Sequence, residues 1–335
     1  MISAFGAEFD VAPGYLNTPS VGIPPRHVVG AVRAWVDDWA SGGLSAPAMD
    51  EPVDRTREAF AALTGFPTGD VAIHSVVSGL LAPVAASFER GTRVLTAAGE
   101  FTSVSFPFAA QGHDVTEVPV AEIPHRAGDH DVVAVSVAQS ADGTLVDLDA
   151  LRATDAVVVL DATQSLGWLP ADLSWADVVV AGGYKWLLSP RGCAWGAYSP
   201  RMLDRVTPSA AGWYAGEDRW SSVYGLPLRL ASGARRLDVS PGWVSFVGAA
   251  VALPWLTGLD RSAVHAHGVG LAERLRKELG LPPSPSAIVS IPDPAAPDRL
   301  AAAGVRSAPR AGATRVGFHL YNTDADVDLV LDALG

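Results

Sequence analysis

The sequence predicts an α/β protein whose large domain contains a mainly parallel sheet and whose smaller C-terminal domain is α+β. Short β-branched runs alternate along the chain with helix-compatible stretches, which is the pattern of strands joined by crossover helices. Several of the strand candidates are near-continuous apolar runs, so we expect both faces of the sheet to be covered. The candidates span residues 71–75, 93–96, 132–137, 156–160, 177–181 and 193–198.

The helix candidates are ordinary packing elements at residues 25–39, 52–63, 78–88 and 262–279. The last carries Leu271, Leu275 and Leu279 on one face and charged residues on the other, which is typical of an amphipathic helix. Around residues 199–241 the regular alternation gives way to Gly, Trp, Tyr and Arg, which indicates the wall of a site and a connection between domains. We therefore expect a large domain of residues 15–240 and a small domain made of residues 1–14 and 241–335.

Composition limits the classes of function. The 335 residues are 49% hydrophobic, which is enough for a folded core, and they carry a formal net charge of −12. An acidic chain without basic clusters repels a phosphate backbone, so we expect no nucleic-acid partner. No apolar run reaches the roughly 20 residues of a membrane helix, so we expect no membrane partner. The single Cys193 and the absence of a signal-peptide pattern predict a cytoplasmic protein.

Two charged residues follow neighbouring predicted strands. Asp161 ends one apolar strand, and Lys185 comes just past the next. The ends of parallel strands meet at one edge of a sheet, where α/β proteins bind their ligands, so we expect the two side chains to be neighbours. A structural ion pair at the sheet edge is the alternative interpretation.

The surroundings of Lys185 favour a role in catalysis. It follows a Gly182-Gly183-Tyr184 turn and precedes an apolar segment, features that give a fixed backbone and a pocket in which the amine is neutral enough to attack an aldehyde. Asp161 suits the opposite end of the same group, where it would keep a pyridine nitrogen protonated. Together the two residues predict a pyridoxal phosphate site.

At these residues the chain resembles the class V aminotransferase family of fold-type I pyridoxal phosphate enzymes, which includes cysteine desulfurases, kynureninases and isopenicillin N epimerases. The resemblance covers residues 15–323. Asp161-Ala-Thr-Gln164 is similar to the family's Asp-x-x-Gln/His segment, and Tyr184-Lys185-Trp-Leu is similar to its lysine segment. The resemblance implies that Asp161 contacts the pyridinium, that Gln164 approaches the ring hydroxyl, and that Lys185 forms the Schiff base and later moves the proton at the substrate's α-carbon.

The resemblance implies further cofactor contacts. Phe101 stands where the family places an aromatic residue or a His that stacks on the ring, although a Phe after a strand is also typical of a core. Gln139, before a Gly turn, stands where an amide approaches the ring hydroxyl and the substrate. Ser240, in a Ser-Pro-Gly segment, stands where the partner subunit reaches the phosphate, which implies a homodimer with a shared active site.

The phosphate site is predicted where a strand ends and a helix opens, at Ser75-Val76-Val77-Ser78. Backbone N–H groups and the helix dipole favour an anion there. Ser75 and Ser78 are the candidate ligands, with Ser78 as a simple N-cap the alternative, and Val76 and Val77 stand where the family has Thr. Tyr184 is expected to supply a phosphate hydroxyl, as a Tyr does in kynureninase-like members.

Two residues are expected to bind the substrate. The segment from Arg315 to Tyr-Asn-Thr resembles a family signature, and a guanidinium matches a planar carboxylate with two parallel hydrogen bonds. Taken alone, Arg315 would be interpreted as a surface charge. Asn17 resembles an N-terminal residue of the family that lies over the site. His265 and His267 have no further ligands at metal spacing, so we expect no metal.

The sequence narrows the reaction without fixing it. Desulfurases carry a mobile Cys shortly before the carboxylate-binding Arg, whereas residues 304–314 contain none and Cys193 lies in a predicted strand, so we do not expect a persulfide-type desulfurase. Transamination, C–S or other β-elimination and epimerisation of an amino acid or its derivative stay open. Val76, Val77 and a missing Ser-x-His segment leave a catalytically degenerate relative that binds cofactor or ligand as the alternative.

Overall fold

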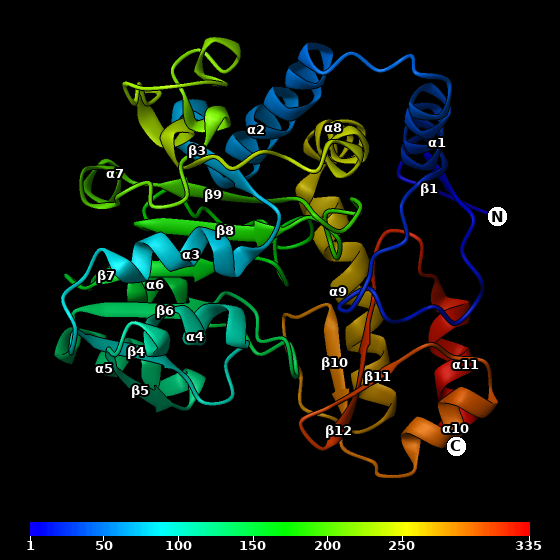
Figure 1. Cartoon of the computed structure of the whole chain (residues 1–335). Helices are drawn as coiled ribbons and strands as arrows, with labels where there is room; N and C mark the ends of the chain where they lie inside the picture. Colours follow the sequence, from blue (N-terminus) through cyan, green and yellow to red (C-terminus); the bar gives the residue numbers. More distant parts are fainter.

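The computed structural model describes residues 1–335 and has a seven-stranded sheet at its centre (Figure 1). The strand order is β3-β9-β8-β7-β6-β4-β5; strands β4 to β8 pair in parallel, and β9 is antiparallel to both of its neighbours. The strands are β3 (Val71–His74), β4 (Arg93–Ala97), β5 (Asp114–Val118), β6 (Val132–Ser136), β7 (Val157–Asp161), β8 (Val178–Gly182) and β9 (Ala194–Tyr198). The prediction of an α/β fold with a mainly parallel sheet is confirmed.

Helices cover both faces of this sheet. The helices of the whole chain, some of which pack on the second sheet described below, are α1 (Arg26–Ser41), α2 (Asp50–Thr64), α3 (Val77–Ala86), α4 (Thr102–Ala110), α5 (Ile123–Arg126), α6 (Leu148–Leu151), α7 (Pro200–Arg205), α8 (Trp243–Thr257), α9 (Arg261–Glu278), α10 (Ala296–Ala302) and α11 (Asp324–Leu334). The four helices expected from the sequence correspond to α1, α2, α3 and α9. In Figure 1, α3 and α4 lie in front of the strands.

The alternation of strand side chains divides the large core into two. Every residue of β6, β7, β8 and β9 is buried, as the apolar runs predicted. In β6, Val133 and Val135 face a core shared with α2 and α8, whereas Val132 and Ala134 face a core shared with α3, α4 and α7. The sheet is therefore a buried layer between two layers of helices.

A second, three-stranded antiparallel sheet has the order β10 (Ile288–Ile291), β12 (Ala313–Gly317), β11 (Ala308–Arg310). Residues of α9, α10 and α11 surround it in a separate core, to which α9 contributes the predicted apolar residues Leu271 and Leu275. Leu16 from the N-terminal segment is buried in the same core. A hairpin of β1 (Ile2–Ala4) and β2 (Ala7–Phe9) packs against α1.

We propose that the large domain spans residues 15–240 and that residues 1–14 and 241–335 form the small domain. The separate core around the second sheet supports this division, and α8, which packs on α1 and α2, connects the two parts. No individual helix has both the length and the apolar character of a membrane span. The helices α8 and α9 have that length and apolar character only when they are counted together, and the chain bends by 94° between them.

A buried ion pair joins α2 to the segment after the sheet. Arg57 of α2 donates a hydrogen bond of 2.7 Å to Asp238 Oδ2, and Asp238 Oδ1 accepts the backbone N–H of Ile73 in β3 at 2.9 Å. Arg57 is 3% exposed and Asp238 is fully buried. The pair therefore neutralises two charges that water does not reach.

We expect Asp238→Ala to lower the free energy of unfolding by about 3 to 5 kcal/mol, because it removes the hydrogen-bonded counter-charge of the buried Arg57 guanidinium and leaves it only the partly exposed Asp54, 3.6 Å from its Nε. Asp131→Ala, which breaks the exposed pair with Arg93, is the control and should cause a much smaller loss. Urea denaturation followed by circular dichroism measures both changes. Similar losses in the two variants would contradict this role of the buried pair.

Candidate active site

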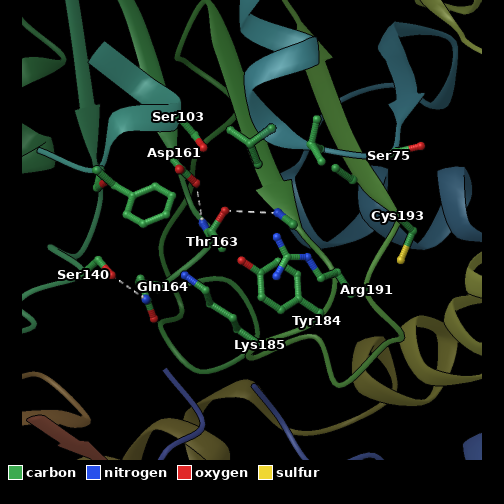
Figure 2. Close-up of a pocket in the computed structure, with 16 residues that line it drawn as sticks. Ser75, Ser103, Ser140, Asp161, Thr163, Gln164, Tyr184, Lys185, Arg191 and Cys193 are labelled. Atoms are coloured by element: carbon green, nitrogen blue, oxygen red, sulfur yellow. Dashed lines mark hydrogen bonds between the residues drawn. The ribbon is translucent and has the colours of Figure 1, made fainter. Parts of the chain in front are cut away.

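The candidate active site lies at the edge of the large sheet where the parallel strands β6, β7 and β8 end. Asp161 is the last residue of β7, and Lys185 follows soon after Gly182, the last residue of β8. Both side chains line one cavity, and in Figure 2 Thr163 is drawn between Asp161 and Lys185. The cavity is lined by Ser75, Val76, Val77, Phe101, Ser103, Ser136, Ser140, Asp161, Thr163, Gln164, Gly182, Tyr184, Lys185, Arg191, Cys193 and Ala194.

Asp161 is a buried carboxylate with few partners. It is 4% exposed, and its Oδ1 accepts a hydrogen bond from the backbone N–H of Thr163 at 2.8 Å. Burial raises the pKa of Asp161, although the hydrogen bonds from Thr163 and the charge of Lys185 act in the opposite direction. The second oxygen, Oδ2, is free to accept a proton-bearing nitrogen placed in the cavity.

Lys185 is buried as well, with 5% of its surface exposed. Burial is the main cause that lowers the pKa of Lys185 to about 8, while the charge of Asp161 opposes this shift. The Nζ atom lies 5.1 Å from the ring centre of Phe101 and 5.6 Å from that of Tyr184. Because a neutral amine is the form that attacks a carbonyl carbon, this pKa leaves an appreciable reactive fraction near neutral pH.

The two charges fit opposite ends of one ring cofactor. Asp161 and Lys185 act on each other through space and share no hydrogen bond. Buried ionisable groups without a direct partner are costly and are typical of functional sites. A pyridinium nitrogen would give Asp161 its missing donor, and an aldehyde carbon would give Lys185 its missing partner. The residues present therefore fit pyridoxal phosphate.

Backbone contacts hold the lysine turn in place. Thr163 joins the two strand ends, because its N–H bonds to Asp161 and its hydroxyl accepts the backbone N–H of Gly182 at 3.0 Å (Figure 2). Gly22, from the N-terminal segment, donates its backbone N–H to the Tyr184 carbonyl at 2.9 Å. A Cβ at Gly22 would collide with the Lys185 carbonyl oxygen, so this approach requires glycine.

Gln164 and Arg315 meet at Ser140 in the wall of the cavity. Gln164 Nε2 donates to Ser140 Oγ at 3.0 Å, and its Oε1 accepts the indole N–H of Trp186 at 2.8 Å. Arg315 Nη1 donates to the carbonyl and hydroxyl oxygens of Ser140, and its Nη2 donates to Ser20 Oγ at 2.8 Å. Gln164 is thus fixed by both ends of its amide.

Arg315 is a buried guanidinium without an acidic partner. It is 1% exposed, and its Nε donates to no acceptor. Burial lowers the pKa of Arg315 to about 10, and the nearby charge of Arg310 acts in the same direction. Because its hydrogen-bond partners are neutral oxygens, no carboxylate compensates the positive charge of the guanidinium, and it can attract an anionic ligand.

A buried carboxylate that the sequence analysis did not select, Glu100, fixes the wall beside Phe101. It is 6% exposed and accepts backbone N–H groups of Phe101 at 2.7 Å and Ser136 at 2.8 Å. Gln139 donates its amide to Glu100 at 3.0 Å and does not line the cavity, whereas Phe101 does. The position of Glu100, directly before Phe101 and shortly after a strand, was the signal that could have identified it.

The expected phosphate loop at the start of α3 is only partly free. Ser75, Val76 and Val77 line the cavity, whereas Ser78 does not. The Nδ1 atom of His74 accepts the backbone N–H groups of Ser75 at 2.9 Å and of Val76 at 3.3 Å. Two of the amides that the sequence offered to a phosphate are therefore already satisfied.

The remaining predicted residues take different positions. Tyr184 lines the cavity directly before the lysine. Ser240 is exposed and lies outside the cavity lining. Asn17 is also outside it, forms a β-bridge with Gly317, and has a buried side-chain oxygen without a hydrogen-bond partner. Two lining residues that the sequence analysis did not select, Thr163 and Arg191, belong to the motifs around Asp161 and Lys185.

A mainly parallel sheet that presents a buried lysine and a buried aspartate to one cavity defines a pyridoxal phosphate enzyme of fold type I. The family model for aminotransferase class-V matches residues 117–301, and the chain belongs to this family. The protein is therefore a pyridoxal phosphate-dependent aminotransferase or lyase that acts on amino acids. The fold and the cofactor expected from the sequence are confirmed.

Known proteins resemble the chain along most of its length. It is 26% identical to the uncharacterized aminotransferase YcbU of Bacillus subtilis, over 91% of the chain and 89% of that protein. It is 26% identical to isopenicillin N epimerase of Streptomyces clavuligerus, over 55% of the chain and 53% of that protein. The cysteine desulfurase CsdA of Escherichia coli has a TM-score of 0.81 at 18% identity, covering 98% of this chain and 96% of its own. The cystine C-S lyase C-DES has a TM-score of 0.83 at 19% identity, covering 97% of each chain.

The lowered pKa of Lys185 can be tested because the sequence has only two lysines, Lys185 and the exposed Lys277 of α9. In cofactor-free protein we expect Lys185 to be acetylated at a rate that rises with pH and is half-maximal near pH 8, since only the neutral amine reacts. Asp161→Asn removes the charge that raises the Lys185 pKa, so the midpoint should move below that of the parent protein. Peptide mass spectrometry measures both lysines, with Lys277 as the internal reference. A Lys185 midpoint near that of a free lysine would contradict the buried environment.

Proposed function

We propose that Lys185 and Asp161 hold pyridoxal phosphate between them, and that the enzyme acts at the α-carbon of an amino acid or amino-acid derivative. The observation that supports this is the pair of buried opposite charges that line one cavity without touching. When bound, the cofactor supplies an electron-withdrawing ring that weakens the bonds to the substrate's α-carbon. The chain supplies the groups that bind, orient and move protons.

Each residue around the cavity has a distinct proposed role. Asp161 keeps a proton on the ring nitrogen, because its carboxylate is buried and has a free oxygen. Lys185, with a pKa of about 8, takes up and returns a proton at the substrate's α-carbon. Phe101 offers an apolar face beside Lys185, and Gln164 holds its amide at the wall next to Ser140.

Arg315 is proposed to bind the substrate's α-carboxylate. Its guanidinium has no acidic partner, and its Nη1 bonds to Ser140, a residue of the cavity lining. A carboxylate can take the place of one of the neutral acceptors and form two parallel hydrogen bonds with the guanidinium fork. This orients an amino acid with its amino group toward the lysine side of the cavity.

The reaction is proposed to be a transamination, a β-elimination such as C–S cleavage, or an epimerisation, and not a persulfide-type desulfuration. Cys193 is the only cysteine, is 1% exposed, and donates its thiol proton to the Pro190 carbonyl at 3.1 Å. Burial strongly raises the pKa of this thiol, so it stays protonated at physiological pH. A fixed, protonated thiol is a poor acceptor for sulfur.

The proposal includes a homodimer in the cytoplasm. Ser240 is exposed and lies outside the cavity of its own chain, which suits a residue that reaches the phosphate of the partner subunit. A free cysteine without a disulfide partner suits a reducing compartment.

The proposed function is tested by titrating the purified enzyme with a panel of amino acids and with the amines that lack their carboxylates. For Arg315→Ala we expect amino-acid affinity to fall by about 10- to 100-fold and amine affinity to stay unchanged, because only the carboxylate contact is lost. Arg315→Lys keeps the charge without the fork and should be intermediate. The absorbance of the bound cofactor reports binding. If Arg315→Ala weakened amines as much as amino acids, the carboxylate assignment would be wrong.

Cys193→Ala tests the proposed exclusion of desulfuration. We expect turnover and KM of the best substrate to stay within about twofold of the parent enzyme, because a protonated thiol held at the Pro190 carbonyl takes no part in the chemistry. Mass spectrometry of the parent enzyme after incubation with L-cysteine should show no added sulfur on Cys193. Sulfur on that residue, together with loss of activity in the variant, would reverse the proposal.

A further inference from the structure

We propose that Arg191, together with the hydroxyl of Tyr184, is the main anchor for the cofactor's phosphate in this chain. The inference rests on the proposed function, because it assumes a cofactor placed between Asp161 and Lys185. It concerns the end of the cavity at the start of α3, where the expected phosphate ligands are weak.

The start of α3 offers a phosphate less than its position suggests. Val76 and Val77 line the cavity with side chains that cannot donate a hydrogen bond. The backbone N–H groups of Ser75 and Val76 already donate to His74 Nδ1. The His74 ring is seated against Gly79, where a Cβ would collide with it, and its burial lowers its pKa, which keeps it a neutral acceptor.

The hydroxyl of Ser75 is also poorly directed for this task. In Figure 2 it points away from Tyr184 and Arg191, whose side chains lie next to each other on the opposite side. Ser78, the other serine of the segment, does not line the cavity. Near α3 a phosphate would therefore find only the backbone N–H groups of the first helical turn, at Val77 and Ser78, and the turn after the lysine supplies further, charged donors.

Arg191 has the geometry of an anion ligand. Its guanidinium carbon lies 5.1 Å from the ring centre of Tyr184, and its charge acts on both Tyr184 and Lys185. The side chain forms no ion pair and no hydrogen bond within the chain, so all of its N–H donors are free. Its backbone is fixed, because the Arg191 carbonyl accepts the hydroxyl of Ser245 at 2.8 Å.

The charges of the cavity favour the same assignment. A phosphate ester carries about −1.5 to −2 charges at neutral pH. Among the residues that line the cavity, Asp161, Lys185 and Arg191 are charged. Lys185 is committed to the aldehyde and Asp161 is negative, so Arg191 is the cation left for the phosphate. The planar guanidinium fork matches two phosphate oxygens.

The test compares pyridoxal phosphate with pyridoxal, which has the same ring and aldehyde but no phosphate. Apoprotein prepared from the purified holoenzyme is titrated with each, and tryptophan fluorescence reports the dissociation constant. For Arg191→Gln we expect pyridoxal phosphate to bind about 10- to 100-fold more weakly, because charge-assisted hydrogen bonds are lost, while pyridoxal affinity is unchanged. Arg191→Lys should be intermediate, and Tyr184→Phe should cause a smaller loss that is also confined to pyridoxal phosphate.

Arg310→Gln is the matched control, because it removes an exposed charge that acts on Lys185 from outside the cavity lining. It should leave pyridoxal phosphate affinity unchanged. The anchor is overturned if Arg191→Gln leaves pyridoxal phosphate affinity unchanged, or weakens pyridoxal equally, or weakens only amino-acid binding to the holoenzyme. If the parent protein bound neither pyridoxal phosphate nor pyridoxal, the proposed function itself would fail, so the two failures are distinguishable.

Discussion

The separation of two buried opposite charges is the constraint on which the active site depends. If Asp161 and Lys185 formed a direct ion pair, each would satisfy the other and no space for a ring would be left between them. Adjacent parallel strands bring the two residues to one edge of the sheet. The contacts of Thr163 and Gly22 then hold the lysine turn at a distance from the aspartate. The fold therefore keeps two charges buried without a direct partner, which is unfavourable, and a bound cofactor can supply the missing partners.

Buried arginines of the scaffold have oppositely charged partners, whereas the charged side chains of the active site do not. The buried guanidiniums of Arg57 and Arg219 have carboxylate partners, Asp238 and Asp54, at hydrogen-bond distance. The charged groups at the cavity form no ion pair at hydrogen-bond distance: Asp161 and Arg315 are buried with neutral hydrogen-bond partners, Lys185 is buried without a hydrogen bond, and Arg191 is exposed with no partner. Unpaired charge thus separates the site from the scaffold more clearly than burial does. Arg191 stands out because it combines free donors with a place in the cavity lining, whereas other exposed arginines without a partner, such as Arg90 and Arg306, lie outside that lining.

The sequence predicted elements with a clear period or a clear apolar run, and it failed where neither was present. The edge strand β5 mixes charged and apolar residues, α4 contains Pro107, and α8 is apolar around its whole circumference, so none of them has a distinctive pattern. In the site, short motifs around Asp161 and Lys185 were enough to propose their chemistry. The role of Glu100 depends on its contacts with Ser136 and Gln139, which are distant in sequence and which local patterns do not contain.

The N-terminal segment lies against the back of the lysine turn and joins distant parts of the chain. Pro19 accepts the Gln164 amide, Ser20 accepts Arg315, and Gly22 bonds to the Tyr184 carbonyl. Ser20 and Arg315 are 295 positions apart. During synthesis on the ribosome, the large sheet can fold well before this closure takes place. The nascent chain therefore has no complete substrate site until Arg315 has been made, although the residues proposed to hold the cofactor are already present by then.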